Sequence, residues 1–140
     1  MSLPRLQSEM PRPCCPRVDE HTELFWKTLE DGKFLLAVCG DCSTTQFPPR
    51  KHCSACYGHN LDWTPASGGG VIYASTRVHA AGGPFAAMAP YTVGIIDLDE
   101  GVRILTRLMH DASSLPPGSR VNLAVIEHTD GPLFVAVNAA

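Results

Sequence analysis

The sequence has no apolar run long enough to cross a membrane. Its longest uninterrupted apolar stretches, such as Phe34 to Val38, have the length of a single strand. The first residues, MSLPRLQSEMPRP, lack the apolar centre of a secretory signal. We therefore expect a cytoplasmic protein without membrane contact, in a compartment that keeps its thiols reduced.

Basic residues are also scarce. Eleven lysines and arginines stand against 14 acidic residues, which gives a formal net charge of −3. A protein that binds nucleic acid mainly through its phosphates needs a concentrated positive surface. The composition therefore disfavours such a protein, although it leaves room for a local basic patch.

A recognisable catalytic set is missing as well. The run Gly68-Gly69-Gly70 leads into a predicted strand rather than a helix, so it does not have the pattern of a phosphate-binding loop. The acids Asp97, Asp99 and Glu100 fall at a predicted hairpin tip, where solvation accounts for them. The histidines are scattered along the chain: His21, His52, His59, His79, His110 and His128. We expect no self-contained active site.

Cysteine, in contrast, is present in an informative pattern. Cys39-x2-Cys42 and Cys53-x2-Cys56 are two matched pairs separated by ten residues. Two such pairs on neighbouring hairpins can close a tetrahedral four-thiolate site with no open position, which predicts structural Zn²⁺. Iron in a rubredoxin-like centre is the alternative, because iron accepts the same ligands.

The remaining thiols and the nearby histidines fit this site less well. Cys14 and Cys15 are adjacent, lie between prolines and fall outside the paired spacing, so we interpret them as incidental. His52 and His59 flank the second pair and could substitute as ligands, but four thiolates already complete the tetrahedron.

The chain divides into three predicted parts. Residues 1–18 carry proline and arginine without periodicity and predict a flexible N-terminal arm. Residues 19–66 predict a short helix, with Leu24, Phe25 and Leu29 on its buried face, followed by the metal-binding ribbon. Residues 66–70 predict a flexible break before a third part, residues 67–140.

The third part reads as five strands. Asp99-Glu100-Gly101 and Thr129-Asp130-Gly131 are hairpin signals between consecutive strands. A closed five-stranded OB-fold barrel is the expected architecture, with a small sandwich as its rival. The predicted fold class is therefore mainly β. The predicted strands are Val71–His79, Tyr91–Leu98, Val102–Met109, Arg120–His128 and Leu133–Val137.

The helix, the two cysteine pairs and the five predicted strands follow one another in an order that resembles a known family. That family joins a helix and a rubredoxin-like zinc ribbon to a C-terminal OB-fold and was long catalogued as a domain of unknown function. Ser43 departs from the family pattern, in which glycine is usual after the first cysteine pair. The resemblance covers about residues 24–137. It is carried by Phe25-Trp26, Gly32 to Leu36, the two cysteine pairs, Phe47-Pro48-Pro49-Arg50, Gly70 to Thr76, Pro90-Tyr91 and Asp97 to Gly101.

The resemblance implies a role in acyl-CoA and lipid metabolism. Members of the family are typically accessory subunits that dock onto a catalytic chain and help to hold a CoA-linked substrate. The expectation is a non-catalytic, acyl-CoA-binding subunit that docks onto a thiolase-like, aldolase, hydratase or acyltransferase partner. The alternatives are a single-stranded nucleic-acid-binding OB-fold protein and a scaffold without a small ligand. A second copy of the chain, in a homodimer, is a further candidate partner.

Arginines are the natural candidates to hold the phosphates of CoA. Arg103 and Arg107 are four residues apart on one predicted strand and therefore share a face. Arg77 lies on another strand, and Arg50 and Lys51 lie in the ribbon. For each of them, a solvated surface charge is the competing interpretation.

Overall fold

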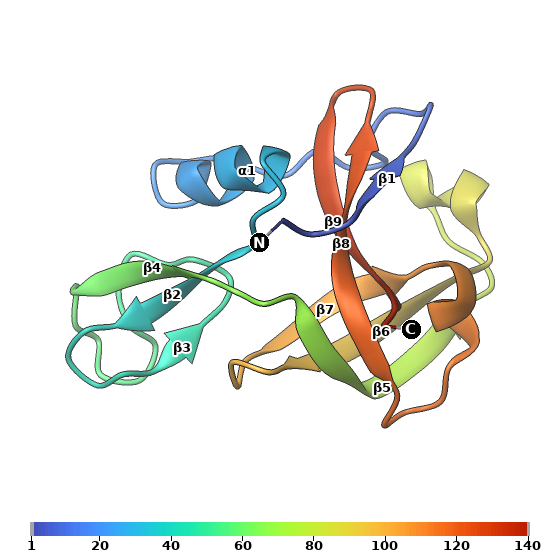
Figure 1. Ribbon diagram of the computed structural model, residues 1–140. Coiled ribbons are helices and arrows are strands. Elements are labelled where there is room, and N and C mark those ends of the chain that lie inside the picture. The colour runs from blue at the N-terminus through green and yellow to red at the C-terminus, as the bar shows by residue number, and fades with distance from the viewer. Residues whose placement is uncertain (1, 140) are drawn as a thin grey trace.

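The computed structural model describes residues 2–139; residues 1 and 140, at the ends of the predicted arm and barrel, lie outside the described residues. The helix α1, the ribbon and the barrel form three neighbouring bodies (Figure 1). Within residues 2–139, no helix is long and apolar enough to span a membrane. The predicted fold class, mainly β with a short helix, a cysteine-bearing ribbon and a five-stranded closed barrel, is confirmed.

Five strands close the barrel. They pair in the order β8-β5-β6-β7-β9, and β9 returns to β8 along its whole length. Along β6, buried and half-buried residues alternate strictly, as expected for a strand with one face in the core. Ile72, Ile96 and Leu123 fill the barrel interior and are at most 1% exposed. The strand bounds are β5 Gly69–Val78, β6 Tyr91–Leu98, β7 Arg103–Leu108, β8 Arg120–His128 and β9 Gly131–Asn138.

Two short 3-10 helices interrupt the barrel connections. Helix η1 (Gly83–Met88) lies between β5 and β6, and η2 (His110–Ser114) lies between β7 and β8. Ala112 of η2 is fully buried, whereas η1 contains no buried residue. The first of these helices therefore lies on the surface of the barrel.

The ribbon is a small antiparallel sheet in the order β3-β2-β4. Its strands are β2 (Leu35–Cys39), β3 (Thr45–Gln46) and β4 (Leu61–Pro65). With only two residues in β3, the sheet has little apolar core of its own, so the ribbon depends on its cysteine site and on its contact with the rest of the chain.

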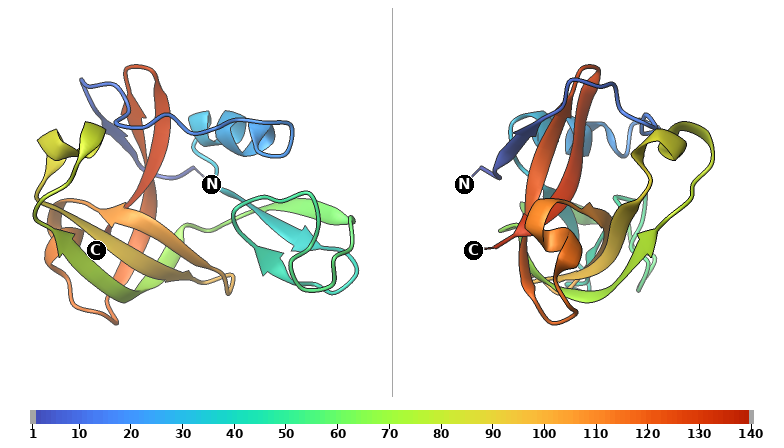
Figure 2. Two further views of the ribbon diagram at one scale, coloured as in Figure 1. Left: turned by 180° about the vertical axis from the view of Figure 1, so that it is seen from behind. Right: turned by 90° about the vertical axis from the view of Figure 1, so that its right-hand side faces the viewer.

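An aromatic cluster joins the ribbon, the helix and the barrel. Phe25 belongs to α1 (Glu23–Glu30). Its ring centroid lies 5.1 Å from that of Phe34, 5.3 Å from that of Phe47 and 6.1 Å from that of Phe134. These partners belong to the chain before β2, the loop after β3, and β9. The helix, the ribbon and the barrel therefore share one continuous core. In both views α1 lies beside the β8–β9 hairpin and above the ribbon (Figures 1 and 2).

The arm differs from the flexible segment that the sequence predicts. Strand β1 (Arg5–Gln7) pairs in parallel with the second half of β8, beyond the part of β8 that pairs with β5. Leu3 is 7% exposed and donates its backbone N–H to Gly32. The arm then turns back over the tip of the β8–β9 hairpin (Figure 2).

The prediction of a flexible break at residues 66–70 is wrong for its glycines. Gly69 and Gly70 belong to β5, and Gly68 is buried beside Leu3. A side chain on Gly70 would have its Cβ 2.8 Å from the carbonyl oxygen of Asp97 and 2.8 Å from Ile96. Glycine is thus used here for close approach of two strands rather than for mobility.

Replacing Gly70 by alanine is expected to lower the free energy of unfolding by about 1–3 kcal/mol, because the backbone of β6 cannot yield to the added methyl group. Urea denaturation followed by circular dichroism measures the change. Gly82→Ala is the matched control, since no atom lies within 4 Å of the added Cβ there. Equal stability of the two variants would contradict the close-packing interpretation.

Candidate functional site

The four paired cysteines converge at the tip of the ribbon. Their sulfur atoms all lie within 4.8 Å of one another. The Cys39 and Cys56 sulfurs are 3.6 Å apart, and those of Cys42 and Cys53 are 3.5 Å apart. A tetrahedron with metal–sulfur bonds of about 2.3 Å has edges of about 3.8 Å, so the donor set fits a four-thiolate metal site.

Two equivalent turns present the thiols. The N–H of Ser43 donates to the carbonyl oxygen of Cys39, and the N–H of Tyr57 donates to that of Cys53, both at 2.9 Å. Ser43 and Tyr57 both have a φ of 63°, the left-handed region that favours glycine. The expected strain at Ser43 is therefore present, and it leaves the ligand geometry intact.

The thiols lie in different electrostatic surroundings. Hydrogen bonds from the Thr44 side chain and backbone lower the pKa of Cys42 to about 6. The Gly58 N–H lowers the pKa of Cys56, but the sulfurs of Cys39 and Cys42 outweigh it and raise that pKa to about 12. Neighbouring thiols thus resist joint ionisation, and a bound cation would allow all four to be thiolates.

The nominated arginines do not form one patch. Arg103 and Arg107 share the outer face of β7, as predicted, but their surroundings differ. Arg103 is exposed, lies 2.5 Å from the Asp97 carboxylate and places its guanidinium carbon 3.7 Å from the centre of the Tyr73 ring. Arg107 is half-buried and contacts methionine sulfurs.

The other nominated cations lie apart from Arg103. Arg77 shares a hollow of about 380 Å³ at the end of the barrel with Arg107 and Tyr91. Arg50 and Lys51 border a separate hollow of about 220 Å³ in the ribbon. The structure therefore brings Arg77 and Arg107 together and separates the ribbon cations from them.

The contribution of the arm to a larger hollow escaped the sequence reasoning. This hollow measures about 490 Å³ and lies between the arm, η1 and the outer face of the barrel. Its wall includes Met10 and Arg12 from the arm, which the sequence predicts to be flexible. Because no local pattern reveals that the arm folds back onto β8, no signal in the sequence indicates this wall of the hollow.

Comparison with known proteins places these features in context. A DUF35 domain-containing scaffold protein of Methanocaldococcus jannaschii is 34% identical over 60% of this chain and 61% of its own length. A probable enoyl-CoA hydratase alpha subunit of Thermomonospora curvata is 27% identical over 67% of this chain and 29% of its own length. The benzoylsuccinyl-CoA thiolase subunit BbsA of Thauera aromatica is 30% identical over 62% and 59%, respectively. The chain thus spans less than two thirds of the length of these relatives.

A solved structure gives a longer match. The chain resembles one described as the Ltp2-ChsH2(DUF35) aldolase with a TM-score of 0.78 and 26% identity, over 90% of this chain and 100% of the other. Family models match in two adjoining segments. Residues 26–62 match the rubredoxin-like zinc ribbon domain of ChsH2, and residues 63–127 match its C-terminal OB-fold domain. Together these matches cover well over half of the chain, which therefore belongs to the ChsH2 family of paired zinc-ribbon and OB-fold domains.

Proposed function

We propose that this chain is a non-catalytic accessory subunit that docks onto a thiolase-like, aldolase or hydratase chain and contacts its acyl-CoA substrate. The observation that carries the proposal is the likeness, over 90% of this chain, to a chain described as the Ltp2-ChsH2(DUF35) aldolase. Relatives described as a scaffold protein and as thiolase and hydratase subunits support the same role.

Zn²⁺ is the metal that we propose for the ribbon. Four sulfur donors at tetrahedral spacing leave no coordination position for a substrate or water. The ion would therefore hold the two cysteine-bearing turns together rather than act in catalysis. The role of the metal would be to keep the ribbon in a fixed shape for docking.

Two of the three acids at the hairpin tip are paired with arginines. Asp97 pairs with Arg103, and Asp99 receives two hydrogen bonds from Arg120 at 2.7 and 2.9 Å. The Arg120 hydrogen bonds also lower the pKa of Asp99, which keeps that carboxylate ionised. Exposed, paired carboxylates of this kind are suited to a surface role rather than to proton transfer. The same pairing withdraws two arginines from any basic groove for nucleic acid.

The hollow at the barrel end is our proposed contact with CoA. Arg77 supplies a cation, and Tyr91 supplies an aromatic surface beside it. Phosphate oxygens and an adenine ring have matching chemistry. An accessory subunit could hold the nucleotide here while the partner acts on the thioester.

Co-expression with thiolase-like, aldolase and hydratase catalytic chains tests the proposal. We expect one of them to elute with this chain as a stable complex in size-exclusion chromatography, and acyl-CoA turnover to require both chains. Binding of CoA and of a short single-stranded oligonucleotide would be measured in parallel. Turnover by this chain alone, or binding of the oligonucleotide in place of CoA, would overturn the proposal.

A further inference from the structure

The largest of these hollows lies on the outside of the barrel. It is about 490 Å³ in volume, within the range of small-molecule sites, and three segments enclose it. The arm forms one wall, η1 forms the second, and residues of β7 and β8 form the floor. The segments come from opposite ends of the chain, so the site exists only in the completed fold.

The lining is mostly apolar and adaptable. Methionines come from all sides: Met10 from the arm, Met88 from η1 and Met109 from the residue after β7. Ile126 lies on the floor, and prolines complete the rim. Unbranched thioether side chains adjust to the shape of an aliphatic or aromatic group. The cavity is thus suited to an apolar chain.

One charge in this lining has no counterpart. The Arg107 guanidinium lies 2.8 Å from the Met109 sulfur and 3.7 Å from the Met88 sulfur, and within residues 2–139 no carboxylate pairs with it. Burial lowers the pKa of Arg107, which reflects the cost of holding the cation there. Weak sulfur acceptors do not replace the hydration that the guanidinium has lost.

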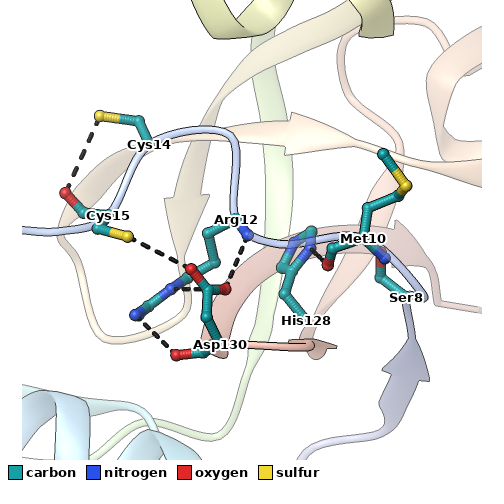
Figure 3. A network of polar contacts seen from close by, with 7 residues as sticks. All are labelled: Ser8, Met10, Arg12, Cys14, Cys15, His128 and Asp130. Atoms are coloured by element: carbon teal, nitrogen blue, oxygen red, sulfur yellow. Dashed lines mark hydrogen bonds and ion pairs between the residues drawn. The ribbon is translucent and has the colours of Figure 1, made fainter.

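The second arginine of the cavity is already neutralised. Arg12 donates its backbone N–H to the Asp130 carboxylate at 2.8 Å, and its side chain lies 3.4 Å from the same oxygen. Figure 3 shows this clasp and, beside it, the ring of His128 facing the main chain of Met10. These contacts fix the arm against the hairpin. The cavity therefore has a defined wall and one uncompensated positive charge.

We propose that this cavity binds an apolar chain that carries a single carboxylate, with Arg107 as the partner of the anion. A carboxylate matches the planar guanidinium in a bidentate pair and balances one charge with one charge. The several phosphate charges of CoA would exceed the one free cation here. A neutral chain would leave Arg107 uncompensated.

This assignment rests on the cavity alone. It is independent of the proposed function, and simple aliphatic carboxylates are sufficient to test it.

Calorimetric titration of the zinc-loaded full chain tests the site with octanoate and octanamide. We expect octanoate to bind and octanamide to bind at least tenfold more weakly. Arg107→Gln should weaken octanoate binding by about 10- to 100-fold, as is typical when a charged hydrogen-bond partner is lost. Arg107→Lys keeps the positive charge but lacks the paired N–H donors of the guanidinium, and it should bind octanoate with intermediate affinity.

Arg120→Gln is the matched control, because it removes an arginine that is paired with Asp99 outside the cavity. It should leave octanoate binding unchanged. The assignment is wrong if octanoate fails to bind at millimolar concentration, if octanamide binds equally well, or if Arg107→Gln binds octanoate normally. CoA binding that depends on Arg107 without octanoate binding would assign the site to phosphate instead. Octanoate binding in a chain that joins no catalytic partner would keep this site and refute the accessory role.

Discussion

Replacing Cys53 by serine is expected to abolish stoichiometric metal binding and to unfold the ribbon of residues 33–62. Cys53 is fully buried, and its sulfur is one vertex of the four-sulfur cluster. A serine hydroxyl does not ionise at neutral pH and cannot replace the thiolate. Metal binding contributes on the order of 10 kcal/mol to the folding of small structural zinc sites, and the three-stranded ribbon has little else to replace it.

Native mass spectrometry measures the metal content of this variant, and hydrogen exchange measures the protection of the ribbon amides. Cys15→Ser is the control, because Cys15 is exposed and lies outside the cluster. The aromatic cluster also predicts that the damage spreads to the barrel, since Phe34 and Phe47 contact Phe134 of β9. A Cys53→Ser protein with one bound metal and fully protected ribbon amides would refute the structural role of the site.

Phe25→Ala is expected to lower the free energy of unfolding by about 3–5 kcal/mol, the usual range for removing a buried phenylalanine. Phe25 is 1% exposed, and four aromatic rings surround it. Its loss opens a cavity at the point where helix, ribbon and barrel meet. The ribbon and the barrel should then unfold in separate transitions, whereas the parent chain should unfold in one.

Chemical denaturation followed by tryptophan fluorescence and by circular dichroism distinguishes these cases. Leu24→Ala is the control on the same helix, because Leu24 is 43% exposed and should cost less than about 1 kcal/mol. If Phe25→Ala cost no more than Leu24→Ala, the aromatic cluster would not be what joins the three parts.

Local patterns were sufficient to predict the barrel strands. The strand predicted over Tyr91–Leu98 has the same bounds as β6, and that over Arg120–His128 has the bounds of β8. Both lie next to strong turn signals, and burial alternates strictly along β6. The cysteine spacing likewise predicted the four-sulfur cluster, because two short turns suffice to bring the four sulfurs together.

Long-range pairing could not be predicted in this way. Strand β1 has three residues and no distinctive alternation, and it forms only because β8 offers a free edge. Gly69 and Gly70 have the composition of a linker, but tertiary packing makes them part of a strand. Sequence alone does not distinguish glycine used for flexibility from glycine used for close approach.

The different surroundings of the candidate arginines also could not be predicted from local sequence. The strand period correctly placed Arg103 and Arg107 on one face of β7. Their different roles depend on Asp97 and Tyr73 beside one of them and on Met88 of η1 beside the other. Those neighbours come from separate segments, so the half-buried position of Arg107 follows only from the assembled fold.

The pairing of β1 with β8 has a consequence for the order of events during synthesis. Residues 5–7 leave the ribosome 120 residues before their partners at 125–127. The ribbon can fold early, but this segment must wait without a partner strand until the last hairpin emerges. We therefore expect the segment to dock onto β8 late in folding. A bulky protein fused on the N-terminal side of β1 would slow this docking more than it would slow the folding of the ribbon.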